Sequence, residues 1–384
     1  MKWQNKGHEL DEMGSKISYF KKCIIFGAGT NGEDLYNGLH NYIDVIGFID
    51  NNPSKTLNGY LGLPVYPVAE INNILDCETA VIISASSYMS DIIDQLGDYG
   101  LKYNVNLFDR RFYQIYMWYS KQMLCSQACA ISVTERCTLN CRYCKVMIPY
   151  FRNPKDGDIS VLKRDVDLFF NAFDYVCEFE LFGGEPFLHP DLNELVFYIG
   201  ENYKSRIGKI KVLTNGTVNS GIQDIFSGSS NRYGVRISVS DYTESLPNIK
   251  PSFEKFIENL QINKIEYEIR TRDKWWIDYG RETINRCDSS EDEMIELFDK
   301  CFMKCRLLKD GKYYNCQDDG FALKADFVEY DSGFSLLDFG KEDKMALLEY
   351  DYGYSEKGYV DLCRKCAGYL TINKNFVPVA EQVR

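Results

Sequence analysis

The segment CTLNCRYC, at residues 137–144, carries three thiols within eight residues and follows an apolar stretch that begins at Ile131. We predict that stretch to be a strand and the cysteines to lie on the loop after it. Three thiolates on a four-iron cube leave one iron without a protein ligand. Zinc is the alternative, but zinc sites favour paired cysteines or cysteine–histidine sets, and no histidine lies near this loop. The spacing therefore favours an iron-sulfur cluster.

The region around this loop alternates between short apolar runs and amphipathic stretches. We predict strands near residues 131–134, 178–182, 209–213, 234–240 and 265–270, with helices between them. Such alternation is typical of a parallel sheet covered by helices, so the fold class is α/β.

These features resemble the radical S-adenosylmethionine (SAM) superfamily, in which CxxxCxxC follows the first strand of a partial (β/α)6 barrel. The second predicted strand ends in Gly183-Gly184-Glu185-Pro186, which is similar to the GGEP motif of that family. The resemblance implies a [4Fe-4S] cluster on Cys137, Cys141 and Cys144, whose open iron binds SAM. Reductive cleavage of SAM then gives a 5'-deoxyadenosyl radical, which abstracts hydrogen from a substrate carbon.

The resemblance also implies which residues bind SAM. Gly183, Gly184 and Glu185 would engage the SAM amino group, and the third strand would present Asn215 to the cofactor. In the same family, a polar residue on the fourth strand contacts the ribose and a basic residue on the fifth lies near the carboxylate. The candidates here are Ser238 or Ser240 and Arg270, although such residues are as often plain loop anchors.

After residue 300 the cysteines become closely spaced, and Asp310-Gly311 predicts a hairpin turn. The spacing by itself also suits zinc. Behind a radical SAM core, the module resembles the twitch domain, a shortened relative of the SPASM extension that holds an auxiliary [4Fe-4S] cluster. Either Cys301 or Cys305 supplies the first ligand, and we prefer Cys301. The expected ligands are Cys301, Cys316, Cys363 and Cys366.

The N-terminal region begins with an apolar run, residues 22–26, followed by a glycine-rich turn and a helical pattern. This order predicts a Rossmann-like doubly wound sheet, in which Gly27, Gly29 and Gly32 seat a pyrophosphate and Asp50 reaches a ribose. The region also resembles the nucleotide-sugar-binding domain that precedes some sugar acyltransferases. A scaffold or docking domain without a nucleotide is the alternative.

Length and composition set the outer limits. A chain of 384 residues predicts two or three folded units, and we expect them at residues 1–112, 113–300 and 301–384. The net charge of −12 disfavours nucleic-acid binding, which needs a basic face. We find no membrane-spanning or secretory segment, so we expect a cytoplasmic protein, in which the clustered members of the fourteen cysteines serve as metal ligands or catalytic groups.

The resulting functional hypothesis is a radical SAM oxidoreductase that dehydrogenates or epimerises a sugar or nucleotide-linked sugar. The auxiliary cluster would accept the remaining electron, and a flavodoxin or ferredoxin would reduce the first cluster. A peptide-modifying radical SAM maturase and a non-catalytic metal-binding scaffold are the alternatives. No residue is assigned as hydrogen donor or proton base.

Overall fold

A computed structural model describes residues 1–85, 89–219, 233–270, 275–301 and 305–383. The chain divides into two compact units: an N-terminal unit of residues 4–127, and a C-terminal unit of residues 128–384 together with residues 1–3. The first boundary therefore lies at residue 127 rather than at 112, and residues 301–384 belong to the same unit as the barrel.

Within the described residues, the N-terminal unit contains a five-stranded parallel sheet in the order β3-β2-β1-β4-β5. This is the doubly wound order predicted from the glycine turn. The central strands are almost fully buried, as expected for a parallel sheet with covered faces. The elements are α1 (Asp11–Ile17), β1 (Lys22–Phe26), α2 (Thr30–Leu39), β2 (Asp44–Ile49), α3 (Pro53–Thr56), β3 (Val65–Tyr66), η1 (Val68–Glu70), α4 (Ile71–Ile74), β4 (Thr79–Ile83), α5 (Met89–Gly97), β5 (Leu107–Phe108) and α6 (Phe112–Lys121).

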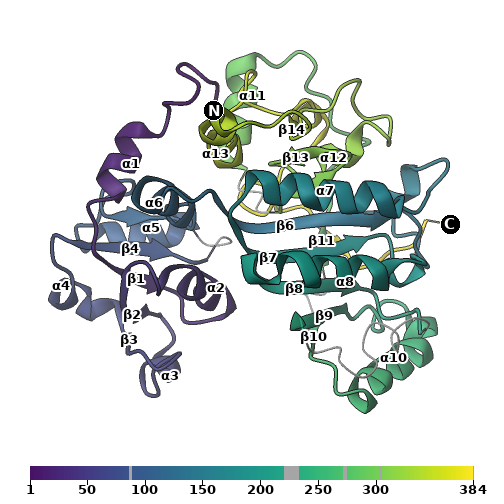
Figure 1. Cartoon of the computed structure of the whole chain (residues 1–384), viewed down its shortest axis with the longest axis horizontal. Helices are drawn as coiled ribbons and strands as arrows, with labels where there is room; N and C mark the ends of the chain where they lie inside the picture. Colours follow the sequence, from purple (N-terminus) through teal and green to yellow (C-terminus); the bar gives the residue numbers. More distant parts are fainter. Residues whose placement is uncertain (86–88, 220–232, 271–274, 302–304, 384) are drawn as a thin grey trace. The chain divides into compact units, whose positions relative to one another are not determined.

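The C-terminal unit is built on a second sheet, in the order β10-β9-β8-β7-β6-β12-β13-β14 (Figure 1). Strands β7 to β10 pair in parallel, and β6 lies next to β7. All the strands predicted for the barrel are confirmed. Their bounds are β6 (Cys125–Thr134), β7 (Tyr175–Gly183), β8 (Ile207–Thr214), β9 (Val235–Ser240) and β10 (Tyr267–Arg270).

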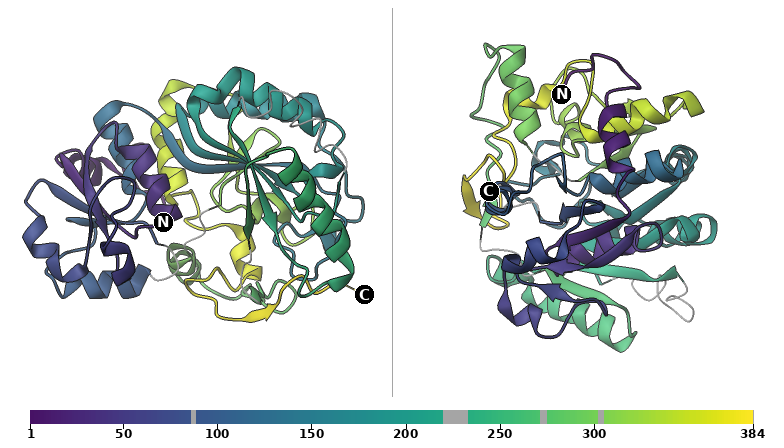
Figure 2. Two further views of the ribbon diagram at one scale, coloured as in Figure 1. Left: turned by 90° about the horizontal axis from the view of Figure 1, so that it is seen from below. Right: turned by 90° about the vertical axis from the view of Figure 1, so that its left-hand side faces the viewer.

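Helices α7 (Ile159–Ala172), α8 (Leu192–Tyr203) and α10 (Lys250–Ile262) lie along one face of these strands, as Figures 1 and 2 show. The Asp158 side chain caps α7 by accepting the backbone N–H groups of its first turn. Phe169 and Phe170 of α7 then pack against Phe179 of β7, with ring centroids 5.6 and 5.8 Å apart. Along each strand, successive side chains point to opposite faces of the sheet. The side chains that alternate with those packed on the helices therefore point to the face away from the helices.

Two of the described strands of the C-terminal unit lie outside this sheet. Strand β11 (Trp275–Ile277) pairs antiparallel with β15 (Phe376–Pro378), which comes from the far end of the sequence. In the described part of the chain, the five predicted barrel strands share one sheet, to which neither β11 nor β15 belongs.

The C-terminal module begins with the predicted hairpin, β12 (Leu307–Lys309) and β13 (Lys312–Tyr314). Asp310 and Gly311 have φ of 53° and 75°, the positive values that a two-residue hairpin turn requires. We expected a separate module, but β12 pairs in parallel with β6 and extends the barrel sheet. The other elements are α11 (Glu291–Lys300), α12 (Asp319–Ala322), β14 (Phe334–Ser335), η7 (Lys341–Asp343), α13 (Lys344–Tyr352) and η8 (Asp361–Lys365), with short η2 (Ile148–Tyr150), η3 (Pro186–Leu188), η4 (Lys204–Arg206) and η6 (Pro247–Ile249) in the barrel.

Among the helices described, none has the combination of length and apolar character that crossing a membrane requires.

Candidate functional site

The three-cysteine loop, residues 137–144, follows β6 and presents its sulfurs to several N–H donors. The Leu139 backbone N–H and the Asn215 amide lie 3.4 and 3.6 Å from Cys137 Sγ. The Gln382 amide lies 3.2 Å from Cys141 Sγ. These donors favour negatively charged sulfur, the form in which cysteine binds metal.

Burial is the main influence on these thiols. It raises the pKa of Cys137 and of Cys141 to about 12, while the neighbouring N–H donors act in the opposite direction. Burial also raises the pKa of Cys144. Buried thiols of this kind become thiolates when a bound metal compensates their charge. Their donor set and surroundings fit a three-cysteine cluster.

The glycines of GGEP lie against the backbone of the cysteine loop. A Cβ at Gly183 would lie 2.2 Å from Thr134 O, and a Cβ at Gly184 would lie 2.1 Å from Arg136 O. Gly183 also has φ of +146°, which disfavours other residues. Both glycines are therefore required by the contact between the end of β7 and the segment from Thr134 to Arg136, which leads into the cysteine loop.

Glu185 is completely buried beside the third strand. Its carboxylate accepts hydrogen bonds from Thr214 Oγ1 at 2.7 Å and from the Asn215 backbone N–H at 2.8 Å. Burial raises its pKa to about 7, although these hydrogen bonds and that from the Phe187 N–H oppose the shift. Glu185 therefore ties the end of β7 to the end of β8 next to the cysteine loop.

Asn215 completes this contact, because its amide also donates to Thr138 Oγ1 at 3.1 Å. Its side-chain oxygen accepts the backbone N–H of Thr217 at 3.0 Å, which fixes the orientation of the amide. The structure thus brings Glu185, Asn215 and Cys137 together, as predicted from three separate segments.

The candidates for the SAM ribose and carboxylate lie on one polar face of the barrel sheet. Ser238 is fully buried, and its Oγ donates to Glu268 at 2.8 Å, so its hydroxyl is engaged within the sheet. Ser240 is the last residue of β9 and is partly exposed. Arg270 ends β10, with its Nε 3.8 Å from Glu268 Oε1. Ser240 and Arg270 are therefore at strand ends, and Ser238 is not.

Sequence reasoning missed the rest of this polar face. Lys211 is 5% exposed, and its ammonium lies 2.7 Å from Glu178 and 3.6 Å from Glu268. Burial, together with the charge of Glu178, raises the pKa of Glu180 to about 7. The signal was available, since charged or polar residues occupy at least two alternate positions in each of β7, β8, β9 and β10. They face the interior of the barrel, opposite the helices.

The second cysteine site is a cavity in the C-terminal module, lined by the four predicted auxiliary ligands. Apolar side chains such as Leu297 and Phe298 form much of its wall, and Asp318 also borders it. Among the described residues, no three His, Cys, Asp or Glu side chains lie close enough together to bind a single metal ion. The sulfurs are therefore spread around the cavity. The four cysteines are Cys301, Cys316, Cys363 and Cys366.

The structure separates the two candidates for the first auxiliary ligand. Cys301 lines the cavity and accepts the backbone N–H of Tyr369 at 3.3 Å. Cys366 likewise accepts the N–H of Gly368 at 3.3 Å. Cys305 is not part of the cavity wall; its nearest charged neighbours include Lys145 and Arg306. The preference for Cys301 agrees with this geometry.

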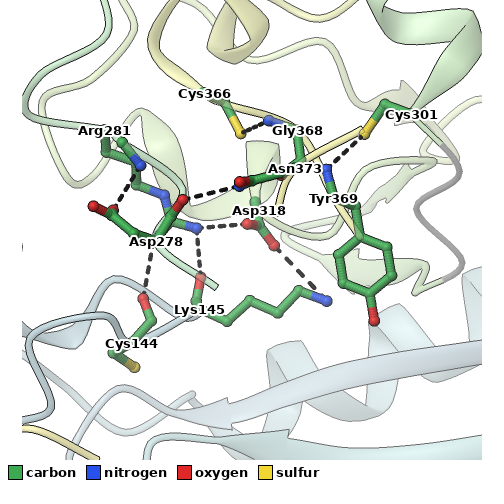
Figure 3. A network of polar contacts seen from close by, with 11 residues as sticks. Cys144, Lys145, Asp278, Arg281, Cys301, Asp318, Cys366, Gly368, Tyr369 and Asn373 are labelled. Atoms are coloured by element: carbon green, nitrogen blue, oxygen red, sulfur yellow. Dashed lines mark hydrogen bonds and ion pairs between the residues drawn. The ribbon is translucent and has the colours of Figure 1, made fainter. Parts of the chain in front are cut away.

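A buried arginine connects the two cysteine sites (Figure 3). Arg281 donates to Cys144 O at 2.9 Å and to Lys145 O at 3.3 Å, and its guanidinium lies 2.5 Å from Asp318 Oδ2. The Lys145 ammonium lies 4.0 Å from the other carboxylate oxygen. Because Asp318 borders the four-cysteine cavity, this network links the loop of the first site to the wall of the second.

In the N-terminal unit, the predicted glycine turn and acid do come together. A Cβ at Gly32 would lie 2.1 Å from Gly27 O, so the turn depends on that glycine. Gly29 is the N-cap of α2. Asp50 accepts the Ala28 N–H and the Lys55 ammonium, each at 2.9 Å, and these bonds outweigh burial and lower its pKa. Lys55 was not predicted.

Comparison with known families agrees with this geometry. Residues 131–265 match the family model of the radical SAM superfamily, and residues 19–105 match a model described as C2185-like, N-terminal. The first match contains the three-cysteine loop, GGEP and the ends of β8 and β9. Residues 131–265 are therefore similar to a radical SAM domain, and this superfamily implies a [4Fe-4S] cluster and SAM.

Curated relatives match over shorter stretches. An uncharacterized protein, MJ0907, of Methanocaldococcus jannaschii is 30% identical over 139 residues, which are 35% of this chain and 47% of the relative. The antilisterial bacteriocin subtilosin biosynthesis protein AlbA of Bacillus subtilis is 34% identical over 90 residues, 22% of this chain and 18% of AlbA. A GTP 3',8-cyclase of Campylobacter jejuni is 30% identical over 118 residues, 30% and 36% of the two chains. The chain thus spans less than half of each.

Solved structures with similar folds include BtrN in complex with AdoMet and 2-DOIA, at 15% identity and a TM-score of 0.38, covering 63% of this chain and 92% of BtrN. Another is Streptococcus suis SuiB bound to the precursor peptide SuiA, at 14% identity and a TM-score of 0.32, covering 75% of this chain and 83% of the other.

Proposed function

We propose that this protein is a radical SAM oxidoreductase that uses two iron-sulfur clusters to dehydrogenate or epimerise a sugar or nucleotide-linked sugar. The observation that carries the radical SAM chemistry is the packing of GGEP and the third strand on the three-cysteine loop. When bound, the cluster and SAM supply a 5'-deoxyadenosyl radical, which removes hydrogen from the substrate.

In this proposal, Cys137, Cys141 and Cys144 hold the first cluster, and the GGEP backbone receives the SAM amino group. Glu185 is suited to that group, because its carboxylate already lies where GGEP, the third strand and the cysteine loop meet. Ser240 is our candidate for the ribose, since Ser238 is engaged by Glu268. The Arg270 guanidinium would offset the charge of the SAM carboxylate.

We further propose an auxiliary [4Fe-4S] cluster on Cys301, Cys316, Cys363 and Cys366. Four sulfurs around one cavity supply all the protein ligands of a cubane, so every iron would be capped. Such a cluster suits electron transfer rather than SAM binding. It would accept one electron from the substrate radical, which also releases a proton, and these losses yield the dehydrogenated product.

Two features support a hydrophilic substrate. The barrel interior carries Glu178, Glu180, Lys211 and Glu268, which suit the hydroxyl groups of a sugar. In the N-terminal unit, the glycine turn, Asp50 and Lys55 together suit the ribose and diphosphate of a nucleotide-linked sugar.

A peptide-modifying maturase is the second candidate, and the match to AlbA favours it. Binding of UDP-sugars and of acidic or hydrophobic peptides, measured on the same preparation, discriminates between the two. Peptide binding at micromolar concentration without sugar binding would replace the leading candidate.

The central experiment is anaerobic incubation of the reconstituted protein with SAM and dithionite. We expect 5'-deoxyadenosine, and deuterium transfer into it from a labelled substrate sugar. Absence of 5'-deoxyadenosine from a preparation that holds its full iron content would contradict radical SAM activity and leave a metal-binding scaffold.

We also propose a cytoplasmic location and a flavodoxin or ferredoxin as electron donor. The clustered cysteines, as proposed metal ligands, suit a reducing compartment, where disulfides are rare. Reduction of the first cluster by such a donor in place of dithionite tests the partner.

A further inference from the structure

The segment after β15 runs along the three-cysteine loop. Ala380 has φ of +56°, and after this turn the chain forms an antiparallel bridge between Gln382 and Cys141. Arg142 N donates to Glu381 O at 2.7 Å, and Val383 N donates to Asn140 O at 2.8 Å. The C-terminal segment therefore holds the loop by its backbone on both sides of Cys141.

The side chain of Gln382 is fixed by its hydrogen bonds. Its oxygen accepts the backbone N–H of Asn140 at 2.8 Å, and because an N–H can only donate, the orientation of the amide is determined. The amide nitrogen then donates to Ala380 O at 2.7 Å and to Cys141 Sγ at 3.2 Å. Both hydrogens of the amide are thereby used, and one of them points at the sulfur.

The donors to the three sulfurs come from different parts of the chain. Backbone N–H groups close in sequence, those of Leu139 and of Val146 and Ile148, donate to Cys137 and Cys144, and the Asn215 amide also donates to Cys137. The donor to Cys141 comes from Gln382, which is 241 residues away in the sequence. Val379 and Ala380, both buried, pack around the same cysteine.

Hydrogen bonds to cluster sulfurs affect the reduction potential, because an added electron increases the negative charge on the sulfurs. An N–H that stabilises this charge favours the reduced cluster. We infer that Gln382 is a positioning residue that raises the reduction potential of the three-cysteine cluster, so that the C-terminal segment helps to control electron entry. This inference rests on the proposed function, since it requires the cluster on Cys137, Cys141 and Cys144.

The test uses Gln382→Met and Gln382→Glu in the full-length, cluster-loaded protein. Gln382→Met keeps the length of the side chain but removes the donor, and Gln382→Glu keeps the acceptor for Asn140 but replaces the donor by an oxygen. Glu381→Gln is the matched control, because Glu381 contacts Arg142 at 3.3 Å and no sulfur. Midpoint potentials are measured by anaerobic redox titration followed by electron paramagnetic resonance, in variants that also carry Cys363→Ala and Cys366→Ala so that one cluster signal remains.

We expect a more negative potential in both Gln382 variants, with the larger shift in Gln382→Glu, and an unchanged potential in Glu381→Gln. Unchanged potentials in Gln382 variants that hold full iron would overturn the inference. So would loss of iron from both Gln382 variants, which would assign Gln382 to cluster retention instead. A parent protein without iron or SAM cleavage would refute the proposed function itself, a different result.

Discussion

The two cysteine sites differ in how the chain assembles them. The three-cysteine loop is one continuous segment of eight residues, whereas the four-cysteine cavity gathers cysteines from three segments between residues 301 and 366. In the proposed function, the first site would leave one iron of a cubane open, and the second would cap all four. A short loop thus suits a reactive cluster that must accept SAM, while a closed cavity suits a cluster that only exchanges electrons.

The largest expected effect is the loss of the open site. Replacing Cys137, Cys141 and Cys144 by alanine should reduce the iron content from about eight to about four per chain. Formation of 5'-deoxyadenosine from SAM should then be abolished, because no open iron remains. Iron and sulfide assays and chromatography of the nucleoside measure both effects. Persistent cleavage in this variant would show that SAM binds elsewhere.

The second prediction concerns the closed site. Cys363→Ala with Cys366→Ala should also halve the iron content, yet cleavage of SAM should remain within about twofold of the parent. Formation of oxidised product should be lost. Cys305→Ala is the control and should retain about eight irons, because Cys305 lies outside the cavity wall. Zinc in the module would contradict the electron-acceptor role.

The third prediction tests the link between the sites. Arg281 and Asp318 are 7% and 1% exposed, so Arg281→Gln leaves a buried carboxylate without its main partner. We expect a loss of about 3 kcal/mol in the free energy of unfolding, or roughly 6–12 °C in Tm. The double variant Arg281→Met, Asp318→Leu should lose less free energy of unfolding than the sum of the losses in the two corresponding single variants. Strict additivity in anaerobic melting curves would show that the two residues act independently.

The fourth prediction is a pH dependence at the open site. Because the pKa of Glu185 is raised to about 7, the carboxylate is protonated below that pH and ionised above it. Only the ionised form accepts both hydrogens that the SAM amino group offers. The measured quantity is the SAM affinity of the parent divided by that of Glu185→Gln. This ratio should fall by up to about tenfold per pH unit below pH 7 and stay constant above it. A flat ratio in anaerobic calorimetry from pH 5.5 to 8.5 would exclude this role.

The smallest effect is expected in the N-terminal unit, which contains neither of the two cysteine sites. Lys55→Ala should weaken binding of a UDP-sugar by roughly tenfold, since one cation near the diphosphate is removed. Lys102→Ala, an exposed lysine of the same unit, is the control. Equal affinities in both variants would favour a scaffold domain, and SAM cleavage should be unchanged in either.

Much of the site was predictable because its residues carry local signals. The three-cysteine loop and GGEP have fixed spacings, and the hairpin at Asp310-Gly311 follows from turn chemistry. The polar face of the barrel has a local signal too, a period of two in adjacent strands, although it was not used. Lys55 and Arg281 have no such signal, since single basic residues are common on loops and helices.

The sequence alone determined the alternation of strands and helices, the three-cysteine loop and the set of possible auxiliary ligands, because each depends on spacing along a short stretch of chain. The tertiary structure placed Cys301 but not Cys305 in the cavity wall, attached β12 to the barrel sheet, and brought Arg281 to Asp318 and Gln382 to Cys141. The last two contacts join residues that are 37 and 241 positions apart in the sequence. Only the packing of the folded chain specifies such distances.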